Sequence, residues 1–362
     1  MKQIYITALV IAIFAFFGCA QPPAEAPPEM TPPAETTPPA PTPSSPTPTP
    51  TPMPRGTVDP DIHVDIYQPD MVWDGTTLLA DNHNLDRPRI IEVNMLGEII
   101  WEYQVPQNLR QYTNPGFDTE WLPNDNILFV LPGNGVYEIE RDGNTVWSYL
   151  DNKVSHDADR LPNGNTLVVY GHEDKISDAQ VKEINPEGEI VWAWYAKDHF
   201  NKSPYKDIYN QGWTHTNAAS RLPNGNTLIS LRNFNFVVEV DPQGTVVKII
   251  GEGIFNYQHD PEMLPSGNIL SATHTSDHAV EIDSKTGEVV WRLAAQEQGM
   301  WRVRDADRLP NGNTLVTDAT KIAEVTPERE IVWLLKVEGV TYEKEDWPRR
   351  GFYKAQRIGI QR

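Results

Sequence analysis

Histidine and arginine residues recur at matching positions of a phrase that this 362-residue sequence repeats. Five copies contain Leu-Pro, and the residues five places before that leucine are Phe117, His156, Asn217, His259 and Arg304. His215 lies two residues before Asn217, and Arg232 and His274 follow the turn of two copies at equivalent places, with His172 nearby in a third. If the copies fold alike, these side chains converge on one cavity, which would bind anions.

Imidazole and guanidinium groups gathered at one site could perform three kinds of chemistry. Neutral histidines are common ligands of divalent metals, although Arg232 and Arg304 would repel a cation. The arginines could bind phosphate or sulfate in a bidentate manner. One imidazole could also act as a nucleophile while its neighbours neutralise the transferred group. A structural interpretation stands beside these, because His-Asp pairs before a strand often satisfy each other and a repeat copies them without function.

The repeated phrase indicates the elements that would position these side chains. Its six copies are VWDGTTLLA, LPNDNILFV, LPNGNTLVV, LPNGNTLIS, LPSGNILSA and LPNGNTLVT, and the turn residues lie 39 to 61 positions apart. Asn-Gly between short apolar runs is typical of a hairpin with a type I′ turn. Each copy therefore predicts one β-hairpin.

A second phrase follows each hairpin, with an alternating strand, a turn and a strand that usually ends in tryptophan, as in RIIEVNMLGEIIWEY. Alternation of apolar and polar residues is the period of a half-buried strand. Four short strands per unit, repeated six times, predict an all-β fold, a six-bladed β-propeller with four-stranded blades. The first strand of each blade would line the central channel. Five tryptophans share one blade position and are expected to pack between blades: Trp101, Trp147, Trp192, Trp291 and Trp333.

Composition excludes some functions. The net charge of −20 argues against a nucleic-acid partner, because phosphate contacts need clustered lysine and arginine. The single cysteine excludes an intrachain disulfide and a multi-cysteine metal site.

The N-terminal region has a different composition from the rest of the chain. A charged start and an apolar run ending Phe-Phe-Gly-Cys over residues 1–19 predict a signal peptide, and the run resembles a lipoprotein lipobox with Cys19 as the lipidated residue. An uncleaved N-terminal anchor is the alternative. Both place the protein outside the cytoplasm and tether it to a membrane.

The remaining boundaries follow from composition and the repeats. Fifteen of the 32 prolines fall between residues 22 and 54, so residues 20–55 are predicted to form a disordered, polyproline-like stalk. The propeller is predicted over residues 56–345, and residues 346–362 are predicted to be a C-terminal tail.

Three stretches resemble the arylsulfate sulfotransferase family, whose members are six-bladed propellers that move a sulfuryl group between phenols without a nucleotide donor. WTHTNAASRLPNGNTLISLRN resembles the family's Trp-x-His-x-Asn stretch and its strand ending Ser-x-Arg, which implies His215 and Arg232 as sulfate ligands. Gln258-His259-Asp260 resembles the Gln-His-Asp motif, whose histidine is the transiently sulfated nucleophile. His156-Asp157 resembles the His-Asp of an earlier blade, which implies a further sulfate ligand.

This resemblance implies a complete reaction. His259 would attack an aryl sulfate, His156, His215 and Arg232 would stabilise the transferring group, and a phenol would accept it in a second step. Asn217, His274 and Arg304 would complete the substrate site, with no metal or organic cofactor. His274 and His278 stand in SATHTSDHAVEID, where the family has an Asp-Asn-Gly element.

Two other functions stay open from the residues. One is a non-catalytic propeller that binds an anionic ligand, a glycan or a protein at the cell surface. The other, less favoured, is a quinone-dependent or lyase-type propeller.

Overall fold

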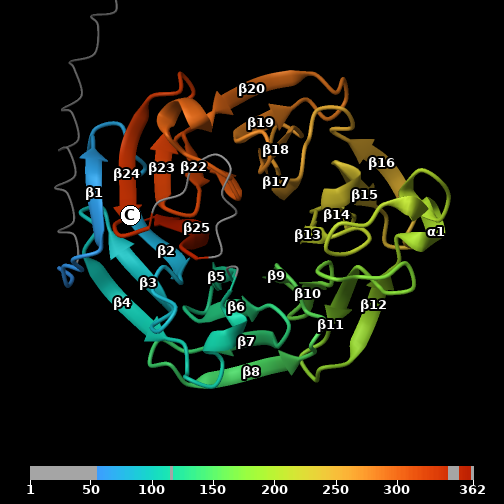
Figure 1. The fold of residues 1–362 in the computed structure, drawn as a ribbon, viewed down its shortest axis with the longest axis horizontal. Helices are drawn as coiled ribbons and strands as arrows, with labels where there is room; N and C mark the ends of the chain where they lie inside the picture. The colour runs from blue at the N-terminus through green and yellow to red at the C-terminus, as the bar shows by residue number, and fades with distance from the viewer. Residues whose placement is uncertain (1–54, 115–116, 341–349, 360–362) are drawn as a thin grey trace, which may run out of the picture. The chain divides into compact units, whose positions relative to one another are not determined.

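The computed structural model describes residues 55–114, 117–340 and 350–359. Six antiparallel sheets are arranged in a ring around a central channel, with the first strand of each sheet nearest the centre (Figure 1). The predicted all-β, six-bladed propeller is confirmed. Cores of buried aliphatic and aromatic side chains lie between neighbouring blades, because each sheet is covered on both faces.

The blades are numbered along the chain, and their strands are given from the channel outward. Blade 1 contains β25 (Phe352–Gly359), β2 (Gly75–Asp81), β3 (Arg89–Asn94) and β4 (Ile99–Gln104). Blade 2 contains β5 (Thr119–Trp121), β6 (Ile127–Leu131), β7 (Gly135–Ile139) and β8 (Thr145–Leu150). Blade 3 contains β9 (Ala158–Arg160), β10 (Thr166–Val169), β11 (Val181–Ile184) and β12 (Ile190–Trp194).

The second half of the ring follows the same order. Blade 4 contains β13 (Thr216–Arg221), β14 (Thr227–Leu231), β15 (Phe236–Val240) and β16 (Val246–Ile250). Blade 5 contains β17 (Gln258–Met263), β18 (Ile269–Thr273), β19 (His278–Ile282) and β20 (Val289–Ala294). Blade 6 contains β21 (Asp305–Arg308), β22 (Thr314–Thr317), β23 (Lys321–Val325), β24 (Ile331–Val337) and β1 (Ile62–Tyr67). The described helices are short: η1 (Arg110–Tyr112), α1 (Lys197–Phe200), η2 (Tyr205–Asp207), η3 (Arg232–Phe234) and η4 (Ala295–Gln298).

Both ends of the described chain close the ring. β1 pairs with β24 and becomes a fifth, outermost strand of blade 6, while β25 pairs with β2 and becomes the innermost strand of blade 1. The predicted C-terminal tail over 346–362 is therefore wrong for residues 352–359. The sequence KAQR at 354–357 resembles DADR, the sequence of β21. β25 therefore supplies the innermost strand of blade 1, which the first hairpin copy does not contain.

The turn of the repeat differs from the predicted type I′ hairpin. In blade 3 the Gly164 amide donates to the Leu161 carbonyl at 2.9 Å, and only Gly164 in this turn has a positive φ, at 87°. Pro162 fixes a negative φ, which suits the first central position of a type I turn, and the glycine then takes the left-handed position of a bulge. Asp125 fills that position in blade 2 with φ 68°.

The predicted packing of the five tryptophans between blades is confirmed. Each donates its indole N–H to a backbone carbonyl of the next blade: Trp101, Trp147, Trp192, Trp291 and Trp333. Each also lies under an arginine of the next blade. That arginine forms an ion pair with a glutamate from the same blade as the tryptophan. Between blades 4 and 5 the tryptophan position holds Lys248 and the arginine position holds Met263, so this interface lacks the three-residue contact.

Some predictions concern residues outside the described part of the chain. The signal peptide with Cys19 and the stalk up to residue 54 lie there. No helix formed by the described residues is both long and apolar enough to cross a membrane.

Candidate active site

The inner strands bring the predicted histidines together at one end of the channel. The ring of His156 lies 5.2 Å from that of His215, and exposed His172 lies within 6.0 Å of both. In blade 5 the rings of His259 and His274 are 4.9 Å apart. The predicted convergence of these residues is thus seen in the structure.

Tyr353 of β25 joins the two histidine groups. Its ring stacks at 5.9 Å from His156 and lies 6.5 Å from His259, and the Arg304 guanidinium lies over it at 5.1 Å. Sequence reasoning missed Tyr353 because its strand was assigned to the tail. The signal that could have found it is the Lys-Ala-Gln-Arg match to the other inner strands.

The tautomer of His215 follows from its three contacts. Nδ1 lies 2.8 Å from the Gln211 carbonyl, which can only accept, so Nδ1 carries the proton. Nε2 is therefore an acceptor, and it receives Arg232 Nη1 at 2.9 Å and His156 Nε2 at 3.2 Å. His156 must then be protonated at Nε2, which leaves its buried Nδ1 without a partner among the described residues.

Arg232 reaches this pair from the end of β14. It donates to the carbonyl of Asn210 at 3.0 Å and to the side chain of Asn233, and its guanidinium lies 4.8 Å from the centre of the Tyr257 ring. Burial lowers the pKa of Arg232 to about 10, so it stays positively charged at neutral pH. Arg232 therefore points into the histidine group and not into a blade interface.

His259 presents one nitrogen for reaction. Its Nδ1 lies 3.0 Å from the Tyr257 carbonyl and must donate to it, which leaves the lone pair on Nε2. Burial, and then the charge of Arg232, lower the pKa of His259 to about 3. At neutral pH the Nε2 lone pair is thus available, as a nucleophile requires.

The other buried histidines are neutral for the same reasons. Burial holds the pKa of His156, His215 and His274 well below the usual value, and neighbouring imidazoles and arginines lower it further. The positive charge of the site at neutral pH therefore comes from Arg232 and Arg304 and not from a set of imidazolium groups.

Backbone irregularities aim these side chains. The pairing of β13 with β14 and of β17 with β18 shifts next to Asn217 and His259, as β-bulges do. His215, Tyr257 and Asp260 have φ between 43° and 54°, a left-handed conformation that costs energy outside glycine. Such strain gathers where a fold must place side chains against the normal strand geometry.

Buried polar groups hold the loops that carry the site. Asp174 accepts hydrogen bonds from the amides of Thr214 and His215 and from Gln180 Nε2. Asn217 donates its amide to the Gln258 carbonyl at 3.0 Å and so ties blade 4 to the strand of His259. Arg304 Nη1 donates to the Phe352 carbonyl at 2.8 Å, which fixes its guanidinium next to Tyr353.

A layer of carboxyl groups lies one residue further along the same inner strands. Lys354 Nζ lies 2.6 Å from Asp157, 3.2 Å from Asp260 and 3.5 Å from Asp118. Burial and neighbouring carboxylates raise the pKa of Asp118 to about 8 and that of Asp157 and Asp305 above the usual range. Burial thus raises the pKa of these acids and lowers the pKa of the histidines beside them.

Three of these acidic groups could hold a cation. Carboxylate oxygens of Asp260, Asp305 and Asp307 lie within 4.8 Å of one another. Lys354 already brings one positive charge to Asp260. The histidine group lies beside them on the same inner strands.

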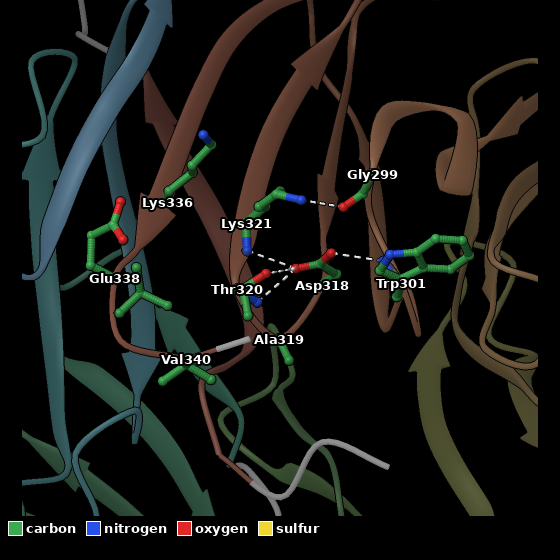
Figure 2. A pocket seen from close by; sticks show the side chains of 10 residues that line it. Gly299, Trp301, Asp318, Ala319, Thr320, Lys321, Lys336, Glu338 and Val340 are labelled. Atoms are coloured by element: carbon green, nitrogen blue, oxygen red, sulfur yellow. Dashed lines mark hydrogen bonds between the residues drawn. The ribbon is translucent and has the colours of Figure 1, made fainter. Parts of the chain in front are cut away.

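A separate pocket opens on blade 6, beside β23 and β24 (Figure 2). Asp318 is buried there and accepts from the amides of Trp301, Thr320 and Lys321. Lys321 Nζ donates to the Gly299 carbonyl. Asp318, Lys321 and Gly299 are thus engaged in hydrogen bonds within the pocket wall, as the dashed lines in Figure 2 show.

Comparison with known proteins identifies the family of the chain. The family model for Arylsulfotransferase (ASST) matches residues 68–260, more than half of the chain and including His156, His215, Arg232 and His259. The chain belongs to the arylsulfotransferase family. Among curated proteins, none matches its sequence.

One solved structure shows the fold in a protein of distant sequence, and a second is less similar to this chain. A protein of unknown function from Bacteroides caccae is 18% identical with a TM-score of 0.56, over 78% of this chain and 98% of its own. Virginiamycin B lyase from Staphylococcus aureus is 12% identical with a TM-score of 0.49, over 78% of this chain and 86% of its own.

Proposed function

We propose that this arylsulfotransferase-family protein transfers a sulfuryl group from an aryl sulfate to a phenol through a sulfohistidine at His259. The observation that carries the proposal is the state of His259, whose Nδ1 is committed to a carbonyl and whose Nε2 stays unprotonated beside two arginines. A neutral imidazole with a fixed lone pair is the activated form of this nucleophile.

The first half-reaction forms the covalent intermediate. Nε2 of His259 attacks sulfur, the nitrogen–sulfur bond forms, and the bond from sulfur to the aryl oxygen breaks. The electron pair leaves with the phenolate, which takes a proton from solvent. Arg232 and Arg304 supply positive charge beside His259 for the sulfuryl oxygens, and such preorganised groups stabilise charge that develops in a transition state.

The second half-reaction restores the protein. The oxygen of an acceptor phenol attacks the same sulfur, its proton goes to solvent, and the electron pair of the nitrogen–sulfur bond returns to Nε2. Donor and acceptor use one site in turn, so ping-pong kinetics are expected. His274 lies against His259 and Asn217 holds its strand, so we assign both to keeping the nucleophile in place.

The assay uses the full chain with a chromogenic aryl sulfate and a phenol acceptor. We expect release of the coloured phenol to depend on the acceptor and to disappear in His259→Ala, with His199→Ala, an exposed histidine of α1, as the matched control. Equal release by wild type and His259→Ala would overturn the proposal. It would leave the alternative of an anion-binding propeller without catalysis.

We also propose that the protein acts outside the cytoplasm, anchored to a membrane by lipidation of Cys19 or by its N-terminal apolar run. The support is the lipobox-like sequence followed by the proline-rich stalk. Incorporation of a labelled fatty acid that is lost in Cys19→Ser is the expected result. The anchor would be contradicted if wild type and Cys19→Ser both lacked the label and were both released from the membrane fraction.

A further inference from the structure

A second pocket, of about 540 Å³, lies between blades 4 and 5. Its walls include the apolar side chains of Phe234, Ile254, Phe255 and Val280. Its polar side includes His278 of β19 and Arg292 of β20. This volume lies in the range of about 300–1,000 Å³ that small-molecule sites occupy.

Strand register explains why the two basic groups share this pocket. Arg292 pairs with Val280, so both side chains lie on the same face of blade 5, and His278 is two residues from Val280 on that face. Val280 packs against the core shared with blade 4. Arg292 and His278 are therefore directed to the gap between the two blades.

This pocket has basic side chains in its lining but no acidic ones. Three other pockets of the described structure each include carboxylates, as at Asp318, Asp59 and Asp174. Arg292 is exposed, and within the described residues no carboxylate lies within ion-pair distance of it. In a chain of net charge −20, this leaves a guanidinium available to an anionic ligand.

The pocket is connected to the histidine site through Tyr257. Asn235, which lines the pocket, accepts the Tyr257 amide at 3.0 Å. The Tyr257 carbonyl holds His259 Nδ1, and its ring lies under Arg232. A ligand in the pocket therefore lies next to the segment that fixes the nucleophile.

We propose that this pocket binds an aromatic anion. The ring would pack against half-buried Ile254, over the buried Phe234 and Phe255 that form the floor, and the acidic group would meet Arg292 and His278. The pocket is distinct from the histidine group, and its ligand class is set by its own residues. The proposal does not depend on sulfuryl transfer, because it concerns equilibrium binding.

The test uses naphthalene-2-sulfonate, whose carbon–sulfur bond cannot take part in the transfer, and follows its fluorescence with the full chain. We expect Arg292→Leu to weaken binding about 10-fold or more, as loss of a charge-assisted hydrogen bond does. His278→Gln should weaken it less. Arg87→Leu, an exposed arginine of blade 1, is the matched control and should bind as wild type.

Two further measurements make the outcome decisive. Arg232→Gln disables the histidine site, and the expected result is that binding in the blade 4–5 pocket persists. The uncharged probe 2-methoxynaphthalene should bind wild type and Arg292→Leu alike. If Arg292→Leu binds the sulfonate as wild type does, or if only Arg232→Gln loses it, the ligand belongs to the histidine site and the proposal is wrong.

Discussion

Two neighbouring layers of the channel use the same inner strands for opposite chemistry. The histidine layer contains His156, His215 and His259, whose pKa values are lowered, and the carboxyl layer contains Asp118, Asp157 and Asp305, whose pKa values are raised. Burial drives both shifts, because it disfavours the charged form of either group. At neutral pH, burial thus gives the protein uncharged bases beside carboxyl groups that hold their protons more tightly.

The two layers also differ in their contacts, although the same inner strands carry both. In the carboxyl layer, Lys354 supplies the counter-charge and the acids accept backbone amides of the next blade, as Asp157 does from Ala219 and Asp305 from Ala355. In the histidine layer, the buried Nδ1 of His156 has no hydrogen-bond partner among the described residues, as is also true of Asp305 Oδ1 in the carboxyl layer. Unsatisfied groups cost stability, and they gather where a ligand can satisfy them.

The largest expected effect is on chemistry in the histidine layer. His259→Ala should lower the rate of sulfuryl transfer on the order of 10⁴-fold, because it removes the attacking atom. Its free energy of unfolding should stay close to that of wild type, since His259 is a desolvated base and not a structural ion pair. Steady-state kinetics and urea unfolding of the same preparation check both parts. A variant that loses activity because it unfolds would contradict the expected free energy of unfolding.

The carboxyl layer should respond in the opposite way to loss of its cation. Lys354→Met should destabilise the fold by about 3–5 kcal/mol at pH 7, the cost of leaving buried charges uncompensated. The loss should shrink as pH falls, because Asp157, which lies 2.6 Å from Lys354 Nζ and has a raised pKa, then takes up a proton. Urea unfolding at pH 7 and pH 5 measures this, and a loss that does not change with pH would show that Asp157 carries no charge in need of Lys354 at pH 7.

The pH dependence of transfer tests the lowered pKa directly. With a pKa of about 3, His259 stays neutral down to about pH 4, so the rate per folded molecule should change little between pH 7 and pH 5. An unperturbed histidine would be protonated over that interval and lose about 30-fold. A rate that falls with a midpoint near 6.5 would place His259 in water and not in the buried site.

The smallest effect concerns the stability that neutral histidines contribute. A histidine whose pKa is lower in the folded state binds more protons when unfolded, so stability is lost as pH falls below about 6.5. His274→Gln should lessen this loss by about 0.7 kcal/mol between pH 7 and pH 6, and by about 1.4 kcal/mol per pH unit well below pH 6.5. Unfolding free energies at pH 7 and pH 6 give the slope, and an unchanged slope would mean that His274 is already charged in the folded protein.

The blades and most side chains of the candidate site could be predicted from the sequence, because the repeated phrase marks both. The Leu-Pro phrase placed His156 and His259 at one position of two blades, and the structure brings them to one Tyr353. It missed Tyr353, since closure of the ring depends on a pairing between the two ends of the chain, and its one local mark is the match of Lys-Ala-Gln-Arg to the other inner strands. The nitrogen of His259 that carries the lone pair was out of reach, because it depends on a carbonyl two residues away in a strained backbone.

The turn shows a different limit. Asn-Gly alone favours a type I′ hairpin, but the preceding proline selects a type I turn, and the glycine becomes the bulge. Proline determines the type of this turn, because its φ range is narrower than that of asparagine or glycine.

The central claim is that His259 carries the sulfuryl group between donor and acceptor. The most direct measurement is peptide mass analysis, at alkaline pH, of the full chain mixed with an aryl sulfate and no acceptor. The account predicts one added sulfuryl group on the peptide that contains His259, its loss when a phenol is added, and no adduct in His259→Ala. Transfer without this adduct, or an adduct that persists in His259→Ala, would contradict it.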